Sequence, residues 1–356
     1  MSQHGDDGLG AWRGRRVLVT GHTGFKGAWL ALLLAELGAE VTGLALAPEH
    51  PDGLYARCGV DEHVDHHTVD VLDADSVARV VARARPDVVL HLAAQSLVPR
   101  SFRDPVRTYA VNVVGTASLL SACAASGPAA VLVVTSDKVY ANDGSGRPFV
   151  ESDPLGGGDP YSSSKAATEI VVQSWRHSFF ADGGPQVATA RAGNVIGGGD
   201  QAEGRLLPDV YRALTAGVPV AVRNPSAVRP WQFVLEPLVG YLRYTDRLAN
   251  GDDVPGALNF GPDAAGAWPV HDVVDKVVEQ WGDGSWAATD DRPGPEAGML
   301  ALDASLARRS LGWRPMLGLT TALAWTSEWY RLAAAGGDCR GLTLEQIRRY
   351  RDMMRA

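Results

Sequence analysis

The sequence predicts an α/β protein built on a doubly wound parallel sheet, followed by a smaller mixed α/β domain. Short apolar runs alternate with helical segments through the first half of the chain, as in sheets whose strands are joined by crossover helices. A glycine-spaced turn joins the first apolar run to the first helix. At 356 residues the chain is long enough for two unequal domains with a sizeable core.

The first unit of the predicted sheet is a short buried strand at 17–19, a turn, and an apolar helix that stops at Gly38. Gly21, Gly24 and Gly27 in the turn follow the spacing GxxGxxG. In such a turn one glycine permits the bend, the next lets a pyrophosphate approach the backbone, and the third lets the helix pack on the strand. The helix N-terminus also presents its positive end and free N–H groups to phosphates. Together these features predict a Rossmann-like dinucleotide site.

The sequence gives fewer signals for the part of this dinucleotide site that would bind the adenosine. After the second strand, in "EVTGLALAPEH", no Asp or Glu occupies the strand end that usually holds the adenosine ribose, and no Arg is placed for a 2′-phosphate. This loop therefore leaves the choice between NAD and NADP open. Asp70 ends another short strand and is expected at the adenine edge, whereas Asp73 and Asp75 are as readily explained as helix-capping residues.

Strands and helices continue to alternate up to about residue 192. "PDVVLHLAA" and "AAVLVVTS" are predicted strands, separated by a helix at 104–127. Asp137 and Lys138 follow the second of these strands, at the carboxyl end where parallel sheets bind ligands. A solvated salt bridge would explain that pair without any chemistry. Tyr161 and Lys165 lie four residues apart on one helix face, a spacing that gains meaning only beside a dinucleotide turn.

Composition limits the possible partners. The net charge of −8 and a pI near 5.6 argue against a nucleic acid or an anionic membrane surface, so an anionic substrate must be met by a local group of Arg and Lys. The three cysteines have neither CxxC spacing nor a disulfide pattern, and the polar start of the chain does not resemble a signal peptide, so we expect a cytoplasmic protein. The histidines are scattered, so no metal site is expected.

Five motifs resemble the extended short-chain dehydrogenase/reductase superfamily: "GHTGFKG", "HLAAQ", "TSDKVY", "YSSSK" and "RAGNVIGGGD". The resemblance extends from about Arg15 to "SLGWRP". Within that superfamily, "GHTGFKGAW", "TSDK", "DPYSSSK", "RAGNVIGGGD" and "RNPSAVRPWQ" resemble the CDP-glucose 4,6-dehydratases. Two loops depart from their pattern, because Gln201 stands where a Trp is expected and "QSLVPRSF" differs after its Gln.

The resemblance implies conversion of CDP-glucose to CDP-4-keto-6-deoxyglucose. The sugar is oxidised at carbon 4, water is eliminated across carbons 5 and 6, and the same hydride returns to carbon 6, so that a tightly bound NAD is regenerated in each turnover. Tyr161 is expected to take the 4-hydroxyl proton, with the pKa of its phenol lowered from about 10 by the Lys165 ammonium and the positive nicotinamide. Ser136 would hydrogen-bond the same hydroxyl.

The elimination needs an acid for the 6-hydroxyl and a base for the carbon 5 proton. In the related dTDP-glucose dehydratases the corresponding pair is Asp followed by Glu, whereas here Lys138 follows Asp137. Asp137 is the natural acid. Lys138 is either the base, which requires burial or a nearby cation to favour its neutral amine, or a cation that stabilises the enolate while Tyr161 or a water moves the proton.

The remaining predicted contacts belong to the cofactor and the substrate. NAD is expected to contact Gly21, Thr23, Gly24, Phe25, Lys26, Gly27, Asp70, Val71, Leu92, Ala93, Ala94, Tyr161 and Lys165. The nucleotide sugar is expected to contact Gln95, Asn194, Arg205, Arg223, Arg229 and Trp231. The three arginines would supply the positive charge that the acidic chain lacks. A single arginine is as readily a surface ion pair, and a tryptophan is more often part of the core.

We expect a dinucleotide-binding domain at 13–192 and a nucleotide-sugar-binding domain at 193–356, with about 226–262 crossing back to the first. Relatives of this kind pair through helices that include the one with Tyr161, so a homodimer or homotetramer is expected. Three other functions stay open: another nucleotide-hexose 4,6-dehydratase, a nucleotide-sugar 4-epimerase, and a cofactor-sensing binding protein without catalysis. An epimerase would need no acid and base for elimination, and a binding protein would be expected to lose Tyr161 or Lys165.

Overall fold

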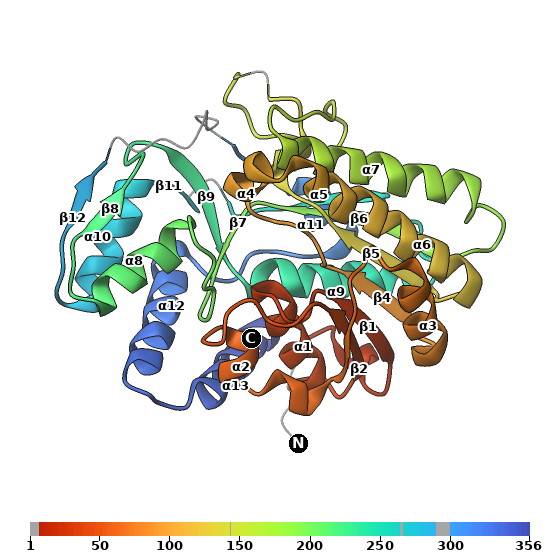
Figure 1. Ribbon diagram of the computed structural model, residues 1–356, viewed down its shortest axis with the longest axis horizontal. Coiled ribbons are helices and arrows are strands. Elements are labelled where there is room, and N and C mark those ends of the chain that lie inside the picture. Colours follow the sequence, from red (N-terminus) through yellow and green to blue (C-terminus); the bar gives the residue numbers. More distant parts are fainter. Residues whose placement is uncertain (1–6, 143, 264–265, 290–299) are drawn as a thin grey trace.

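The protein is built around a seven-stranded sheet in which every pairing is parallel (Figure 1). The computed structural model describes residues 7–142, 144–263, 266–289 and 300–356. In spatial order the strands are β10 (Ala257–Phe260), β6 (Gln186–Ala192), β5 (Ala130–Val134), β4 (Val88–His91), β1 (Arg16–Thr20), β2 (Glu40–Ala45) and β3 (Asp65–Thr68). The order along the chain reverses between β1 and β4. Such a reversal opens a crevice at the carboxyl ends of the strands, where ligands bind.

Helices cover both faces of this sheet, so the predicted doubly wound α/β fold is confirmed. α1 (Phe25–Glu36) and α9 (Leu235–Ala249) lie on one face, with α13 (Cys339–Arg355) packed against α1, and α3 (Ala74–Ala84), α6 (Gly115–Ser126) and α7 (Pro160–Ser178) lie on the other (Figure 1). The strands β4 and β5 are buried throughout, as is typical of central parallel strands. One apolar cluster fills each interface between the sheet and its helices.

The helix predicted at 104–127 is present but is not regular throughout. α5 (Pro105–Tyr109), the π-helical turn η3 (Ala110–Val114) and α6 follow one another without a break. The side chain of buried Asn112 in this turn exchanges hydrogen bonds with the backbone of Gln95 and donates to the hydroxyl of Ser164 on α7 at 2.8 Å. Single π turns are frequent at functional sites. Here the turn ties the loop after β4 to α7.

A smaller mixed region follows β6. β7 (Asn194–Ile196), β9 (Val228–Phe233) and β11 (Ala267–Pro269) form a three-stranded sheet, and β8 (Val220–Val222) pairs with β12 (Trp286–Ala288). α8 (Leu206–Thr215), α10 (Val270–Trp281) and α12 (Leu319–Ala334) pack beside them. From β9 the chain returns through α9 to β10 at the edge of the large sheet. The division into two domains near residue 192 stays a prediction.

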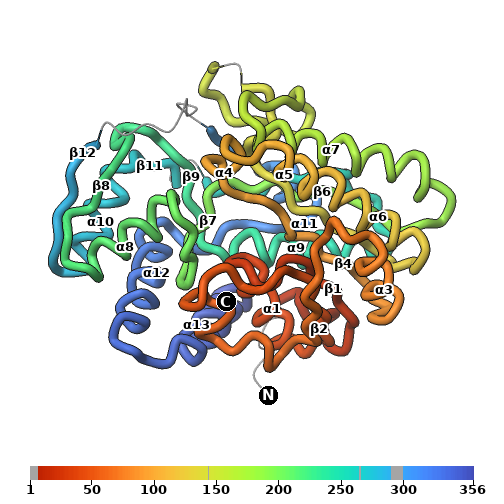
Figure 2. The backbone as a smooth tube through the Cα atoms, viewed as in Figure 1, coloured from red at the N-terminus to blue at the C-terminus, as the bar shows by residue number. Residues whose placement is uncertain are grey.

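Shorter helices complete the described chain. They are η1 (Gly10–Trp12), α2 (Leu54–Arg57), η2 (Val60–His63), α4 (Val98–Arg103), η4 (Asp137–Val139) and α11 (Ser305–Leu311). Both ends of the described chain lie beside α1 (Figure 2). Buried Asp7 accepts hydrogen bonds from Arg351 and Arg355 of α13 at 2.9 Å each, and Arg348 of the same helix pairs with Glu36 of α1 at 2.9 Å. These contacts hold α13 against α1 and against the beginning of the described chain.

The helical segment 105–126 is long and apolar enough to cross a membrane by length and composition alone. It packs against α3 and α7 in the helical layer of the sheet. The outer surface of α5, η3 and α7 nevertheless carries exposed apolar side chains at Val106, Tyr109, Val114 and Ile170, and Val106 is 79% exposed. We refer to these four residues as the α5–α7 face.

Candidate active site

The predicted site residues all line one cavity at the carboxyl ends of the strands. Its volume is about 1260 Å³. The walls are formed by the turn between β1 and α1, the loops after β2, β4 and β5, the start of α7, and loops of the smaller region around β7 to β9. Each catalytic, cofactor-binding and substrate-binding residue predicted from the sequence lies in these walls. Their roles in binding and catalysis stay predictions.

The three glycines of the first turn occupy three different environments. Gly21 has a φ of +74°, and a Cβ there would lie 2.7 Å from the backbone N of Ala93. A Cβ on Gly27 would lie 2.1 Å from the carbonyl oxygen of Gly21, so α1 could not pack on β1. Gly24 lines the cavity, and the nearest atom to an added Cβ is 3.4 Å away. The backbone at Gly24 is therefore open to a ligand at the N-terminus of α1, as a pyrophosphate requires.

The far end of the cavity carries no carboxylate directly after β2. There the Thr23 hydroxyl donates to the carbonyl of Leu46 at 3.0 Å. Asp70 lies in the cavity wall, but one carboxylate oxygen is 2.8 Å from Arg107 and the other accepts the backbone N–H of Leu72 at 3.0 Å. Asp73 is the N-cap of α3, in agreement with the helix-capping interpretation of that residue.

The residues predicted to carry the chemistry meet where β5 and α7 approach each other. Asp159 caps α7 by accepting the backbone N–H of Ser162 at 2.9 Å, and Tyr161 and Lys165 then lie on the buried face of that helix. The ammonium of Lys165 donates to the carbonyl oxygen of Val134, the last residue of β5, at 3.0 Å. Lys165 therefore links the helix to the strand that carries Ser136 and Asp137.

Ser136 is hydrogen-bonded to Asp137 and neighbours Tyr161. The Ser136 hydroxyl donates to Oδ1 of Asp137 at 3.0 Å and accepts the backbone N–H of Lys138 at 3.2 Å. Ser136 also neighbours the phenol of Tyr161, whose pKa its hydroxyl lowers. Tyr161, Ser136 and Asp137 are 7%, 5% and 6% exposed, respectively. A phenol, a hydroxyl and a carboxyl are thus buried near one another in the cavity wall.

The pKa of Tyr161 differs from the sequence-based expectation. Burial raises the pKa of the phenol to about 12, although the hydrogen bond with Ser136 and the charge of Arg205 act in the opposite direction. Burial also lowers the pKa of Lys165 to about 8, against the attraction of Glu169. Desolvation disfavours the charged form of both groups, and the positive nicotinamide is not part of the protein. The protein on its own therefore holds Tyr161 neutral.

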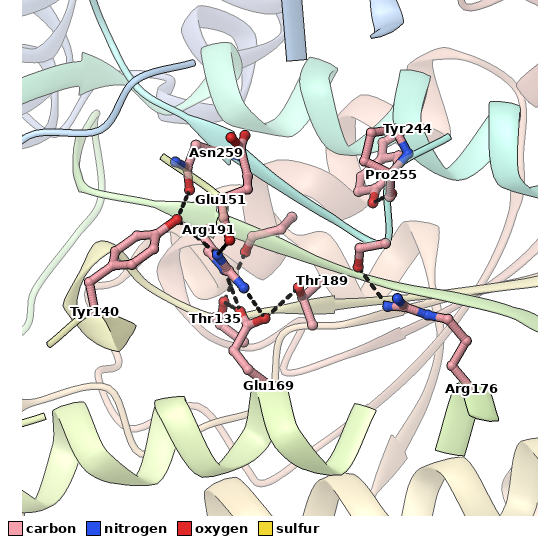
Figure 3. Close-up of polar contacts among 12 residues, drawn as sticks. Thr135, Tyr140, Glu151, Glu169, Arg176, Thr189, Arg191, Tyr244, Pro255 and Asn259 are labelled. Carbon is pink, nitrogen blue, oxygen red and sulfur yellow. Dashed lines mark hydrogen bonds and ion pairs between the residues drawn. The ribbon is translucent and has the colours of Figure 1, made fainter. Parts of the chain in front are cut away.

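The loop that carries Ser136, Asp137 and Lys138 is held at both ends by a buried polar network (Figure 3). Glu169 of α7 accepts the hydroxyl of Thr135 and pairs with Arg191 of β6 at 2.7 Å. The same Arg191 donates to the hydroxyl of Tyr140 at 2.8 Å, and Tyr140 donates to Asn259 of β10 at 2.7 Å. Because the charges are paired and hydrogen-bonded, this network can stay buried and fix the loop.

Lys138 lines the cavity and is half-buried. Among the described residues, no ion pair joins it to Asp137, whose carboxyl is hydrogen-bonded to Ser136 instead. The solvated salt bridge considered as an alternative for this pair is therefore wrong. The position of the ammonium in the cavity wall is compatible with both predicted roles, as base or as cation beside an enolate.

A second lysine of the cavity, Lys26, has a strongly lowered pKa. The ammonium of Lys26, expected only as a cofactor contact, donates to the hydroxyl of Tyr241 at 3.1 Å. Burial lowers the pKa of Lys26 to about 7, assisted by the charges of Arg205 and Lys165 and opposed by Asp137. Lys26 is thus electrostatically coupled to the carboxyl of Asp137. Sequence reasoning missed this coupling because Tyr241 and Asp137 are far away in the chain.

The substrate residues predicted in the smaller region also line the cavity. Arg205 pairs with Asp200 at 3.0 Å and reaches the hydroxyl of Ser96 at 3.1 Å. Arg223 donates to the carbonyl of Gly204 at 2.9 Å. The indole N–H of Trp231 is buried and has no hydrogen-bond partner among the described residues, which fits a donor reserved for a ligand.

Three further predicted residues also lie in this part of the wall. Asn194 stands at the start of β7, and Arg229 donates to the carbonyl of Val228 at 3.0 Å. The side-chain amide of Gln95 bonds within its own loop, to Leu97 and to Thr108. Gln95 therefore shapes this wall, and its contact with a substrate stays a prediction.

The cavity combines a glycine-rich turn at the N-terminus of α1 with buried Ser136, Tyr161 and Lys165 at the junction of β5 and α7. That combination, on a Rossmann-like sheet, defines the class of short-chain dehydrogenases/reductases. The chain belongs to the NAD dependent epimerase/dehydratase family, whose model matches residues 17–261.

Three known proteins show the range of this similarity. The CDP-glucose 4,6-dehydratase of Salmonella typhimurium is 42% identical over 335 residues, which cover 92% of this chain and 93% of that protein. The structure of DesIV, a dTDP-glucose 4,6-dehydratase from Streptomyces venezuelae with NAD and TYD bound, is similar with a TM-score of 0.77 at 26% identity, covering 91% of this chain and 99% of that one. A UDP-glucose 4-epimerase of Thermus thermophilus in complex with NAD gives 0.77 at 27% identity, covering 89% and 99%.

Proposed function

We propose that the protein is an NAD-dependent CDP-glucose 4,6-dehydratase, a hydro-lyase that forms CDP-4-keto-6-deoxyglucose. The observation that carries the proposal is the buried carboxyl of Asp137, hydrogen-bonded to Ser136 beside Tyr161. Loss of the 6-hydroxyl needs an acid at this point, whereas exchange of configuration at carbon 4 does not. The 42% identity with the Salmonella typhimurium enzyme supports CDP-glucose as the substrate.

The cavity fits NAD as the resident cofactor. Gly24 leaves the backbone open at the N-terminus of α1 for the pyrophosphate, and Asp70 and Lys165 line the same cavity. The family and the NAD-bound structural neighbours support NAD. When bound, the nicotinamide accepts a hydride from the sugar and later returns it, so that no external acceptor is consumed.

The side chains of the protein supply binding and proton transfer. Tyr161 and Ser136 are placed to hold the 4-hydroxyl, and Lys165 is fixed against β5 by Val134. Asp137 delivers a proton to the departing 6-hydroxyl. Two alternatives stay open for the carbon 5 proton. Either Lys138 removes it, or Tyr161 or a water removes it while the Lys138 ammonium stabilises the enolate. Arg205, Arg223, Arg229 and Trp231 line the cavity and would bind the nucleotide part of the substrate.

A panel of nucleotide hexoses tests the proposed function. The protein is incubated with CDP-, dTDP-, UDP- and GDP-glucose without added reductant, and alkali-induced absorbance of a 4-keto-6-deoxy sugar is measured. We expect turnover of CDP-glucose without net formation of free reduced cofactor. Conversion of UDP-glucose to UDP-galactose would assign an epimerase, activity with another nucleotide would change the substrate, and cofactor binding without turnover of any sugar would indicate a binding protein.

We also infer that two copies pair through the α5–α7 face. The exposed side chains of Val106, Tyr109, Val114 and Ile170 form an apolar surface on the helix that carries Tyr161 and on its neighbour, and relatives of this kind pair through such helices. Burying such a surface in a dimer removes it from water. The three buried, unpaired cysteines support a cytoplasmic location for this assembly.

The assembly is tested by light scattering of the intact protein and of Val106→Glu combined with Ile170→Glu. We expect a dimer or tetramer for the native protein and a smaller species for the variant. A monomeric native protein would overturn the inference. Flotation with lipid vesicles serves as the control for the alternative that the apolar segment 105–126 binds a membrane.

A further inference from the structure

The loop between Thr135 and Tyr140 carries residues for both halves of the proposed reaction. Ser136 is expected to hold the 4-hydroxyl during oxidation, whereas Asp137 and Lys138 are expected to serve the elimination. All three residues line the cavity. Such residues need support from behind, because a displacement of about 1 Å can slow a reaction by about 10²-fold.

Both ends of this loop are tied to one buried ion pair (Figure 3). Arg191 of β6 holds Glu169 of α7 through two hydrogen bonds of 3.0 and 2.7 Å, a bidentate geometry that fixes both side chains. At the start of the loop, the Thr135 hydroxyl donates to Glu169 at 2.5 Å. At its end, Arg191 donates to the Tyr140 hydroxyl at 2.8 Å. The ion pair is therefore a common anchor for the loop.

Tyr140 contributes to this anchor through its hydroxyl. The side chain is 3% exposed, and its ring stacks on Phe149 with the centroids 4.9 Å apart. The hydroxyl accepts from Arg191 and donates to Asn259 of β10 at 2.7 Å, so its only proton is already used. Arg191 and Asn259 are buried and are not among the described residues that line the cavity. Although Tyr140 borders the cavity, its hydroxyl is thus turned toward the network behind the loop.

The chain that follows β6 confines Asp137 from a second direction. Gly193 lies two residues after Arg191, and an added Cβ on Gly193 would lie 3.0 Å from Oδ2 of Asp137. The other carboxylate oxygen, Oδ1, accepts the Ser136 hydroxyl at 3.0 Å. The carboxyl is therefore held between Ser136 and the end of β6, and Arg191 joins β6 to the Tyr140 end of the loop.

The residues expected to act in the oxidation have supports of their own. Tyr161 and Lys165 lie on α7, where the Lys165 ammonium donates to the carbonyl of Val134 at 3.0 Å. Ser136 directly follows Thr135, at the end of the loop that is tied to α7. Loosening of the opposite end would displace the turn η4 before it displaces these groups.

We propose that Tyr140 is a positioning residue for the elimination, which acts through the turn η4 on Asp137 and Lys138 and leaves the oxidation of carbon 4 unaffected. This inference rests on the proposed dehydratase function and deepens it. The fold then supports the two chemical steps from separate anchors. These are α7 for the oxidation, and the contacts of Tyr140 with Arg191 and Asn259 for the elimination.

Tyr140→Phe tests this role, because it keeps the ring on Phe149 and removes only the hydroxyl. Oxidation is measured alone with CDP-6-deoxyglucose, which has a 4-hydroxyl but no leaving group at carbon 6, by the absorbance of enzyme-bound reduced cofactor after rapid mixing. Elimination is measured with CDP-glucose in a single turnover, by the decay of that absorbance as the hydride returns. We expect oxidation near its native rate and elimination slowed by a factor of about 10 to 10², so that reduced cofactor accumulates.

Steady-state kinetics and a matched variant separate positioning from a general loss of structure. Tyr140→Phe should lower kcat for CDP-glucose with little change in KM or in bound NAD, because the lost hydroxyl faces the network and not the cavity. Tyr244→Phe is the control, since the hydroxyl of this buried residue of α9 donates to the carbonyl of Pro255, away from the cavity wall. This control should keep native rates in both steps. Urea unfolding of both variants measures the stability that each lost hydrogen bond costs.

The possible outcomes separate this inference from the proposed function. Native rates of both steps in Tyr140→Phe, or equal slowing of both, would overturn the positioning role, while turnover of CDP-glucose by the native protein would still support the dehydratase. Loss of bound NAD together with slower oxidation would assign Tyr140 to the general stability of the fold and would also overturn the role. Absence of turnover of any nucleotide hexose by the native protein would overturn the proposed function and the positioning role with it.

Discussion

Burial, more than charge, determines the state of the reactive residues. The charge of Arg205 lowers the pKa of Tyr161, yet desolvation raises the pKa of this phenol and lowers the pKa of Lys165 and Lys26. A buried site thus favours neutral forms until a cofactor and substrate bring further charge.

At this scale we predict that Tyr161→Phe loses activity by a factor of about 10² to 10⁴, since the phenol oxygen handles protons while the ring packs in the wall. Cofactor binding should remain, because the ring of the side chain is kept. Turnover of CDP-glucose and bound NAD are measured on the same preparation. Near-native turnover would remove Tyr161 from the chemistry.

Two substitutions distinguish the two possible roles of Lys138, as base or as stabilising cation. If Lys138 removes the carbon 5 proton, Lys138→Met should oxidise carbon 4, accumulate bound reduced cofactor in a single turnover and fail to exchange the carbon 5 hydrogen with deuterated solvent. If the ammonium only stabilises the enolate, Lys138→Arg should retain considerable activity, since the charge is kept and a deprotonatable amine is lost. Exchange at the native rate in Lys138→Met would exclude Lys138 as the base.

The close packing of α1 on β1 leaves no room for a side chain at one glycine of the turn between them. The turn between β1 and α1 illustrates this, because Gly27 packs against the carbonyl of Gly21 whereas Gly24 faces the cavity. We predict that Gly27→Ala lowers the free energy of unfolding by about 1–3 kcal/mol or more, as overpacking does. Gly24→Ala should leave stability nearly unchanged and weaken NAD binding. Urea unfolding without cofactor and NAD titration distinguish the two effects; equal loss of stability in both would contradict this assignment of the glycines.

The start of α9 contains a buried carboxyl that links three elements. Glu236 accepts the backbone N–H groups of Met316 and Leu317 and the hydroxyl of Tyr350 on α13 at 2.6 Å. Burial raises the pKa of Glu236 to about 7, although these hydrogen bonds lower it. The folded protein therefore retains this proton at a pH where the unfolded chain, with a pKa of about 4.3, releases it.

It follows that Glu236 contributes stability below about pH 4.3 that is lost as the pH rises to 7. Relative to Glu236→Gln, the free energy of unfolding of the native protein should fall across this interval, by at most about 1.4 kcal/mol per pH unit. Urea unfolding of both proteins at several pH values measures the difference. Glu345→Gln, on the exposed face of α13, is the matched control and should show no such trend. A constant difference between native protein and Glu236→Gln would contradict the raised pKa.

Across the whole molecule the cavity is assembled from two regions with separate tasks. The glycine-rich turn and the Tyr161 helix come from the large sheet, whereas Arg223, Arg229 and Trp231 come from β8, β9 and the loops beside them. Arg229→Ala should therefore raise the KM for CDP-glucose far more than it lowers kcat, because it removes uniform binding of the nucleotide. Arg83→Ala, exposed on α3 and outside the cavity, serves as the control. A pure loss of kcat would place Arg229 at the reacting carbons.

Local sequence patterns predicted much of this structure. The apolar runs, the GxxGxxG turn and the i to i+4 pair Tyr161 and Lys165 are local, because strand burial, helix packing and helix faces follow from neighbouring residues. The site residues predicted from them line one cavity. The π-helical turn at Asn112 could not be read in the same way, since it depends on Gln95 and on Ser164 of α7.

The sequence by itself determined the parallel sheet and the glycine-rich turn and predicted Asp137 as the acid and Tyr161 as the phenol, because each of these depends on a short stretch of chain. Only the tertiary structure decided their protonation and their partners. Lys26 meets Tyr241 and Glu169 meets Arg191 through contacts that span up to 215 residues. Desolvation depends on everything packed around a group, and direct hydrogen bonds depend on which elements meet, so neither property belongs to any local segment of the sequence.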